Sequence, residues 1–206
     1  DGSANAIKVD KIWYQFPVGD ELMDWVGPLI ENYYMLASAP SIYKPVTKQF
    51  ALGGNASTYG SSTSPGFGVA WTQQVDDPSE GRFAVSTNYT AKSGASSGTG
   101  LLNEDGKEFF LTKVEYGTPQ WQVSAALAKK TNGETYDGYY HTKAGEDYDE
   151  DLTSIGLRAY WKPDETGAIP SIQVGFDTAS VDDAEDAPDE MSAWMIGLGW
   201  KDLFMD

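Results

Sequence analysis

Apolar and polar residues alternate with a period of two along most of the chain, and no other feature restricts the fold as strongly. In 120–128, Trp121, Val123 and Leu127 share one parity, opposite Gln122. The pattern recurs in segments of similar length: 66–74, 82–92, 110–116, 155–162, 170–177 and 194–201. Because successive side chains of a strand point to opposite faces, each segment predicts a strand with one apolar and one polar face. The sequence therefore predicts an all-β fold.

Short and long connections alternate between these segments. Segments 116–120 and 162–167 are short and contain Gly and Pro, whereas 93–107, 130–152 and 177–191 are long and polar. In an antiparallel meander, alternate connections lie at opposite ends of the sheet, so the long loops would all share one end. Short turns at one end and long external loops at the other are typical of an antiparallel transmembrane β-barrel. Strands of about 9–11 residues suffice to span a bilayer, and no segment approaches the roughly 20 apolar residues of a membrane-spanning helix.

Acidic residues dominate the charge and are concentrated in loops. The formal net charge is −17, and 134–190 holds 16 acidic and 3 basic side chains, a net of −13. Such a balance excludes nucleic acid as a partner, since phosphate contacts need clustered Lys and Arg. The runs 146–151 and 182–190 predict an acidic rim at the long-loop end.

Residues for common metal and catalytic sites are scarce. The chain has no cysteine and a single histidine, His141, which excludes cysteine-type zinc sites, a catalytic thiol and histidine-rich metal centres. We therefore expect no metal, no cofactor and no enzymatic activity.

Five segments carry a resemblance to a known family. IWYQFPV at 12–18, GPLIENYYMLA at 27–37, PSIY at 40–43, GFGVAW at 66–71 and SAWMIGLGWKD at 192–202 resemble the cyanobacterial outer-membrane porins, relatives of the carbohydrate-selective porin superfamily. The resemblance covers nearly the whole chain with the segment order intact. It implies a barrel of roughly sixteen strands, commonly a homotrimer in the cell outer membrane, through which small hydrophilic solutes or inorganic ions diffuse passively. It also implies a surface-layer-homology domain that attaches the barrel to the cell wall.

This chain departs from the family pattern in its extent. Residues 1–206 contain no surface-layer-homology domain, supply only about nine predicted strands and lack a terminal aromatic residue. Nine strands leave unpaired edges, which lipid does not tolerate. We therefore expect residues 1–206 to be the central part of a porin barrel that continues beyond them.

The N-terminal third is less regular than the rest. Strands are predicted at 6–18 and 25–36, followed by a stretch at 37–65 that is rich in Pro, Gly, Ser and Tyr. A long irregular stretch in a compact domain is often functional, and in a barrel it would fold inward as a constriction loop. Its only charged residues, Lys44 and Lys48, would favour small anions at a narrow point, while the acidic rim would attract cations. Strand parity adds five further pore-lining candidates: Glu31, Arg82, Lys113, Glu115 and Arg158.

Two alternatives belong to other functional classes. A soluble carbohydrate-binding β-sandwich would stack exposed Trp and Tyr side chains on sugar rings, and its apolar strand faces would form a dry core. A glycoside hydrolase would need two carboxylates roughly 5–10 Å apart in a cleft, whereas most acids here lie in loops. The channel and the sandwich place the apolar residues differently: the channel turns them outward, and the sandwich buries them. The residues that distinguish these two arrangements are Trp121, Val123, Leu127, Ile172 and Val174.

Overall fold

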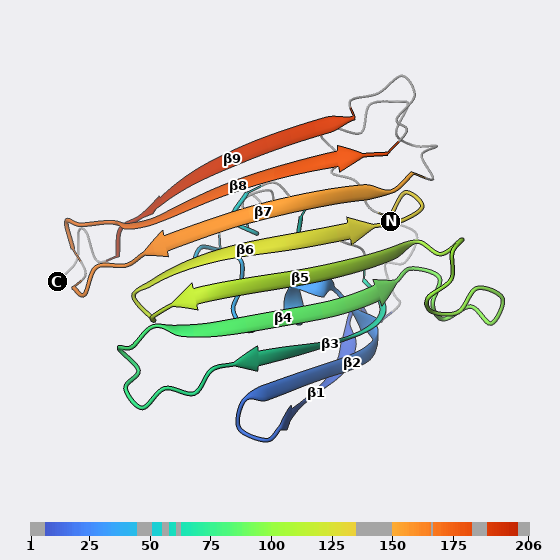
Figure 1. The fold of residues 1–206 in the computed structure, drawn as a ribbon, viewed down its shortest axis with the longest axis horizontal. Helices are drawn as coiled ribbons and strands as arrows, with labels where there is room; N and C mark the ends of the chain where they lie inside the picture. The colour runs from blue at the N-terminus through green and yellow to red at the C-terminus, as the bar shows by residue number, and fades with distance from the viewer. Residues whose placement is uncertain are drawn as a thin grey trace.

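Nine strands form one antiparallel sheet in sequence order (Figure 1). The structure, a computed structural model, describes residues 7–44, 51–54, 58–60, 63–134, 150–165, 167–182 and 189–201. The strands are β1 (Ile12–Val18), β2 (Leu22–Ile30), β3 (Ser64–Thr72), β4 (Arg82–Ala91), β5 (Glu108–Gly117), β6 (Trp121–Lys130), β7 (Leu152–Trp161), β8 (Ser171–Val181) and β9 (Glu190–Gly199). A short 3-10 helix, η1 (Asn32–Tyr34), follows β2. The predictions of an all-β antiparallel fold and of about nine strands are confirmed.

The predicted N-terminal strands were partly wrong in their bounds. The first begins at Ile12 rather than at residue 6, because pairing with β2 starts where Ile12 faces Leu29. The second runs over Leu22–Ile30 rather than 25–36. Its early residues pair with β3, and the chain leaves the sheet after Ile30. Because apolar residues continue after Ile30, the second strand was predicted to run beyond the last residue that has a hydrogen-bonded partner strand.

The long connections leave the sheet at one end and the short turns at the other, as Figure 1 shows. Most of the predicted loop bounds shift by one or more residues, because β4 ends at Ala91, β6 includes Lys130 and β7 includes Leu152. β8 continues to Val181 and β9 begins at Glu190, so the predicted loop 177–191 shortens to 182–189. Of the predicted loop 130–152, residues 135–149 lie outside the described residues. The end-to-end asymmetry expected from the spacing of the strands is therefore present.

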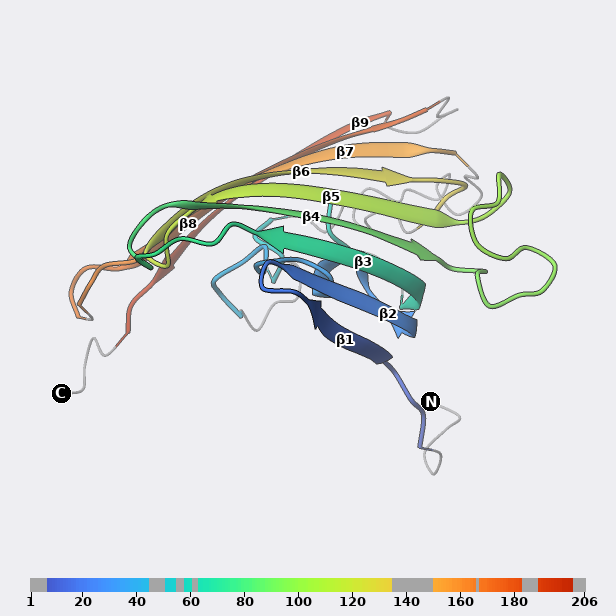
Figure 2. The ribbon, with the colours of Figure 1, turned by 60° about the horizontal axis from the view of Figure 1, so that its bottom comes forward.

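The sheet is curved, with a convex face and a concave face (Figure 2). Apolar side chains are exposed on the convex face: Leu127, for example, is 52% exposed. Val123, Ile172 and Val174 are likewise exposed, and Trp121 is half-buried. Other exposed members of this face are Phe67, Val85, Phe110, Val114, Ile155, Leu157, Phe176, Trp194, Ile196 and Leu198. The outward placement of the apolar parity, which the channel interpretation requires, is therefore observed.

Polar and charged side chains fill the concave face. Lys113 is fully buried there, and Glu115, Arg158, Gln173 and Asp177 are also buried. They are covered by the described residues of the connection between β2 and β3, which lie on the concave side of the sheet (Figure 2). These residues, 31–44, 51–54, 58–60 and 63, are called here the inner segment. The apolar core also lies between the inner segment and the sheet, in a cluster formed by Leu36, Tyr59, Phe109, Leu111, Ala126 and Ala128.

The two edges of the sheet are β1 and β9, which do not pair with each other in the described part of the chain. The sheet is therefore open. Among the residues with described positions, no helix combines the length and hydrophobicity needed to cross a membrane.

Candidate functional site

The inner segment is attached to the concave face at its start by an amide network. Asn32 donates from Nδ2 to Oδ1 of Asn88 on β4, at 2.7 Å. Asn88 in turn donates to the carbonyl oxygens of Asn32 and Met35, at 3.1 and 3.0 Å. Thr90 donates to Oδ1 of Asn32 at 2.7 Å. All of these polar groups are buried, so their hydrogen bonds with one another replace those with water.

A second contact joins Ser38 to a buried ion pair on β5. Lys113 and Glu115 form an ion pair with each other. They are two residues apart on the same face of the strand. Lys113 Nζ also donates to the carbonyl and hydroxyl oxygens of Ser38, at 2.9 and 2.8 Å. The Ser38 hydroxyl donates to Glu115 Oε2 at 2.8 Å. A buried charge pair is costly unless further hydrogen bonds complete it, and the inner segment supplies them.

The third contact involves a cation and an acid on neighbouring strands. Arg158 of β7 donates from Nη2 to Asp177 Oδ2 of β8 at 2.8 Å. Thr58 of the inner segment donates to the other carboxylate oxygen, Oδ1, at 2.8 Å. Arg158 Nε donates to the carbonyl oxygen of Leu52 at 3.1 Å, and its guanidinium lies over the Tyr59 ring. This group, Arg158, Asp177 and Thr58, is called here the arginine clamp.

Several side chains on the concave face of the sheet, called here the wall, donate hydrogen bonds to backbone carbonyl oxygens of the inner segment. Besides Lys113 and Arg158, Gln173 donates to Pro40 O at 3.2 Å, and Lys130 donates to Gly60 O at 2.6 Å. Irregular backbone cannot satisfy its own carbonyls, so a buried loop needs such donors from elsewhere. The concave face thus holds the segment through its backbone carbonyl oxygens as well as through the side chains of Asn32, Ser38 and Thr58.

Glycine on the wall allows the inner segment to approach closely. A Cβ on Gly175 of β8 would lie 1.7 Å from the carbonyl oxygen of Gly53, and that contact admits no side chain. At the edge strand, Cβ atoms on Gly197 and Gly199 would lie 2.5 and 2.6 Å from the ring of Tyr43. The Tyr43 hydroxyl donates to the carbonyl oxygen of Ser171 at 2.7 Å. The ring therefore lies flat on the glycines of β9 because these carry no side chain.

Burial also changes the acid–base behaviour of the inner segment. Desolvation raises the pKa of the Tyr59 hydroxyl above its ordinary value, and it likewise raises the pKa of Tyr33, with Glu31 nearby adding to the shift. Both phenols are therefore neutral across the physiological range. Near the start of β1, a hydrogen bond to Asp10 raises the pKa of Lys11, and Glu31 adds to this at longer range.

The predicted pore-lining residues divide into two groups. Lys113, Glu115 and Arg158 face the concave side, as strand parity predicts, but the inner segment covers them. Glu31 is buried where the inner segment begins, within 3.5 Å of Lys11 Nζ. They therefore anchor the segment instead of facing open space. Arg82 is exposed at the start of β4, near the short turns.

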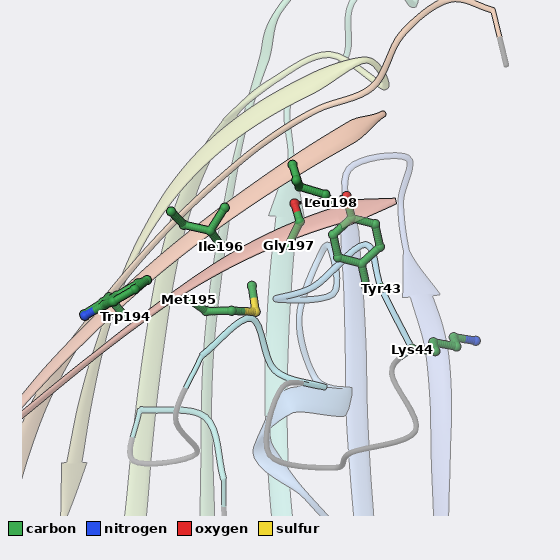
Figure 3. Close-up of a pocket in the computed structure, with 7 residues that line it drawn as sticks. All are labelled: Tyr43, Lys44, Trp194, Met195, Ile196, Gly197 and Leu198. Atoms are coloured by element: carbon green, nitrogen blue, oxygen red, sulfur yellow. Dashed lines mark hydrogen bonds between the residues drawn. The ribbon is translucent and has the colours of Figure 1, made fainter. Parts of the chain in front are cut away.

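Of the two lysines predicted for a constriction, Lys44 is exposed and Lys48 lies outside the described residues. Lys44 follows Tyr43 beside the free edge of β9. The two residues line a groove of about 680 Å³ together with Trp194–Leu198. Figure 3 shows the Lys44 ammonium directed away from β9, while Tyr43 lies against Gly197. Among the described residues of the inner segment, Lys44 is therefore the charged residue whose side chain is exposed.

Sequence reasoning missed the other partners in these contacts. Asp177 was both the last residue of the predicted strand 170–177 and the first of the predicted loop 177–191, and Lys130 was the first residue of the predicted loop 130–152; both belong to strands. Parity within 170–177 puts Asp177 on the same polar face as Gln173 and Gly175, but the sequence did not indicate its partner. Asn32 lay within the predicted strand 25–36 and Thr58 within the irregular stretch 37–65, and neither position carried a pattern that pointed to a partner.

Within the described ranges, no group of three His, Cys, Asp or Glu side chains is positioned to hold a metal ion. The arrangement is instead a loop fixed across a wall of paired charges. Comparisons of this chain with models of protein families, with curated proteins and with solved structures found no match.

Proposed function

We propose that the chain is part of an outer-membrane channel for passive diffusion of small hydrophilic solutes or inorganic ions. The observation that carries this proposal is the distribution of polarity across the sheet. Apolar side chains are exposed on the convex face, and charged side chains lie on the concave face. Water-soluble proteins rarely expose a contiguous apolar surface of this extent, whereas a lipid-facing barrel wall requires one.

Strand length agrees with a membrane-spanning wall. Each strand from β4 to β9 is 10 or 11 residues long. Ten residues at about 3.3 Å each, tilted by roughly 40°, give a height of about 25 Å, which is the height of the apolar band of outer-membrane barrels. The exposed aromatic residues near strand ends, Phe83, Trp161 and Trp200, would then lie at the membrane interface.

A spanning wall must close, because unpaired edges have no hydrogen-bonding partner in lipid. Further strands would join β9 to β1 and complete a barrel of roughly sixteen strands. The resemblance to cyanobacterial porins supports that number, a homotrimer, and attachment to the cell wall through a surface-layer-homology domain. The inner segment would then lie inside the barrel and narrow the aqueous passage, as expected for the stretch 37–65.

Selectivity would depend on the charges that stay exposed. Because Lys113, Glu115 and Arg158 are paired and covered, they contribute little field to an aqueous passage. Of the predicted lining residues with described positions, Lys44 and Arg82 are exposed, and both are cationic. A passage lined by them would favour small anions.

Planar-bilayer recording of the full-length protein tests this function. We expect stable single-channel conductance and, for the detergent-extracted protein, heat-modifiable migration on a gel. The Lys44→Ala and Arg82→Ala variants should each shift the reversal potential in a salt gradient toward cation preference. Lys129→Ala is the matched control, because Lys129 is exposed on the convex face, pairs with Asp151 and should leave selectivity unchanged. Absence of conductance would refute the channel, and unchanged selectivity in both variants would remove these cations from the filter.

The soluble carbohydrate-binding sandwich has less support. It requires a second sheet packed on the apolar face, and the strands in the described residues form one sheet with that face outward. Such a module would also dissolve without detergent, which provides a simple test.

A further inference from the structure

The loop between β4 and β5, residues 92–107, covers the convex face where β4 ends. Strand parity directs Tyr89 and Ala91 to that face, yet each is only 2% exposed. The backbone N–H of Leu102 donates to the Tyr89 hydroxyl at 2.7 Å. A Cβ added to Gly94 would lie 2.5 Å from the Leu101 side chain and 3.2 Å from that of Ala91. The loop therefore covers the end of the apolar face.

Hydrogen bonds inside the loop fix its shape. Gly100 N donates to Ser96 O at 2.8 Å, and the Thr99 hydroxyl donates to Ser93 O at 2.8 Å. Asn103 donates from its side chain to Thr99 O at 3.0 Å and from its backbone to Glu108 Oε1 at 2.9 Å. The Glu108 carboxylate also accepts from the Tyr89 hydroxyl at 2.6 Å, which ties the loop to both strands. Leu101 and Leu102 thus occupy defined positions.

Two adjacent leucines are exposed on this loop, whose other residues are mainly polar or glycine. Leu101 is 46% exposed and Leu102 is 66% exposed. Leu102 has a φ of 57°, in the left-handed region that is unfavourable for a leucine. Outliers of this kind persist where the surrounding contacts over-determine them, and they are a reason to look for a function. Here the conformation presents an apolar pair beside the convex face.

The apolar surface continues directly from the strands to this pair. On the convex face, the rings of Phe67, Tyr89 and Phe110 pack in a row, with centroids 5.4 and 4.6 Å apart. The row runs across β3, β4 and β5 near the long-loop end of the sheet. The backbone N–H of Leu102 contacts the Tyr89 hydroxyl, so the leucines lie next to this row. In a barrel, that position is the outer boundary of the lipid-facing band, where amphipathic rings favour the membrane interface.

We propose that Leu101 and Leu102 insert into the acyl chains of the surrounding membrane and anchor this loop at the outer boundary of the bilayer. The inference rests on the proposed channel function, because it needs the convex face to meet lipid. Its ligand is the lipid hydrocarbon, and contact with a second copy of the chain is the competing outcome.

Residues 1–206 contain no cysteine, so a site-specific label can be attached here once any cysteine elsewhere in the full-length protein is replaced by serine. Leu102→Cys in the full-length protein, labelled with an environment-sensitive fluorophore and reconstituted into bilayers, is the reporter, with Leu101→Cys as a second variant in case the first does not fold. Brominated acyl chains serve as a depth-dependent quencher. Val123→Cys, on the convex face of β6, reports lipid contact, and the exposed loop position Ser97→Cys reports water. We expect the leucine positions to show blue-shifted emission and quenching comparable with position 123.

The outcomes separate the anchor from the channel. Quenching at 123 combined with water-like emission at 101 and 102 would overturn the anchor and leave the channel standing. Blue-shifted emission at the leucines without quenching by brominated lipid would mean that protein covers them, which also overturns the lipid anchor. Water-like emission at position 123 as well would contradict the proposed function itself.

Discussion

The arginine clamp should contribute measurably to the stability of this fold. In the Arg158–Asp177 pair, the side chains are only 4% and 1% exposed. Asp177→Ala would leave the guanidinium buried without its counter-ion, a change that typically costs about 3–5 kcal/mol. The guanidinium keeps hydrogen bonds to the carbonyl oxygens of Leu52, Leu157 and Phe176. We therefore expect the lower end of the range, about 3 kcal/mol.

Urea unfolding of the full-length protein, reconstituted in bilayers as the proposed function requires, measures this cost directly. The double variant Arg158→Met with Asp177→Ala removes both charges and should lose less stability than Asp177→Ala alone, since a buried ion pair is often replaced by apolar groups at little cost. Asp177→Asn is the matched control, because it keeps a hydrogen-bond acceptor for Thr58 but not the charge. Its cost should fall between those of the wild type and the alanine variant.

A second readout shows whether the clamp holds the inner segment. Limited proteolysis should cleave within 31–63 faster in Asp177→Ala than in the wild type, while the strands stay protected. If Asp177→Ala costs less than about 1 kcal/mol, in the range of an exposed ion pair, and cleavage is unchanged, the clamp has no such role. The single variant Arg158→Met completes the double-mutant cycle. A cost of the double variant equal to the sum of the two single costs would show that Arg158 and Asp177 are not coupled.

Two further predictions concern the contact between the segment and the wall. Gly175→Ala should destabilise the fold by about 1–3 kcal/mol in the same urea assay, because its Cβ collides with Gly53 O, whereas Gly98→Ala, with its nearest neighbour at 3.8 Å, should be nearly neutral. In an alkaline titration followed by phenolate absorbance, Tyr59→Phe should remove one late-titrating tyrosine. Since burial raises the folded-state pKa of Tyr59, its contribution to stability is complete below about pH 10 and declines at higher pH, and the variant should lose that alkaline decline. Loss of an early-titrating tyrosine instead would show that Tyr59 is accessible to water.

Strand parity is the most informative feature of the amino-acid sequence. It places Val123, Leu127 and Ile172 on one face and Lys113, Glu115 and Arg158 on the other, and both assignments agree with the fold. This works because the two-residue repeat of a strand is a local property of the backbone. Boundaries are less reliable, as the strand predicted at 25–36 illustrates, since a strand ends where its partner does.

The sequence by itself therefore determined the fold class, the order of the strands, the two faces and the end at which long loops gather. Only the tertiary structure decided that the inner segment crosses the concave face and that Arg158, predicted to line an open passage, is covered and paired with Asp177. These contacts join distant parts of the chain: Gln173 and Pro40, for instance, are 133 residues apart. Local pattern carries no information about such pairs, because they arise from the curvature of the assembled sheet and the path of irregular chain across it.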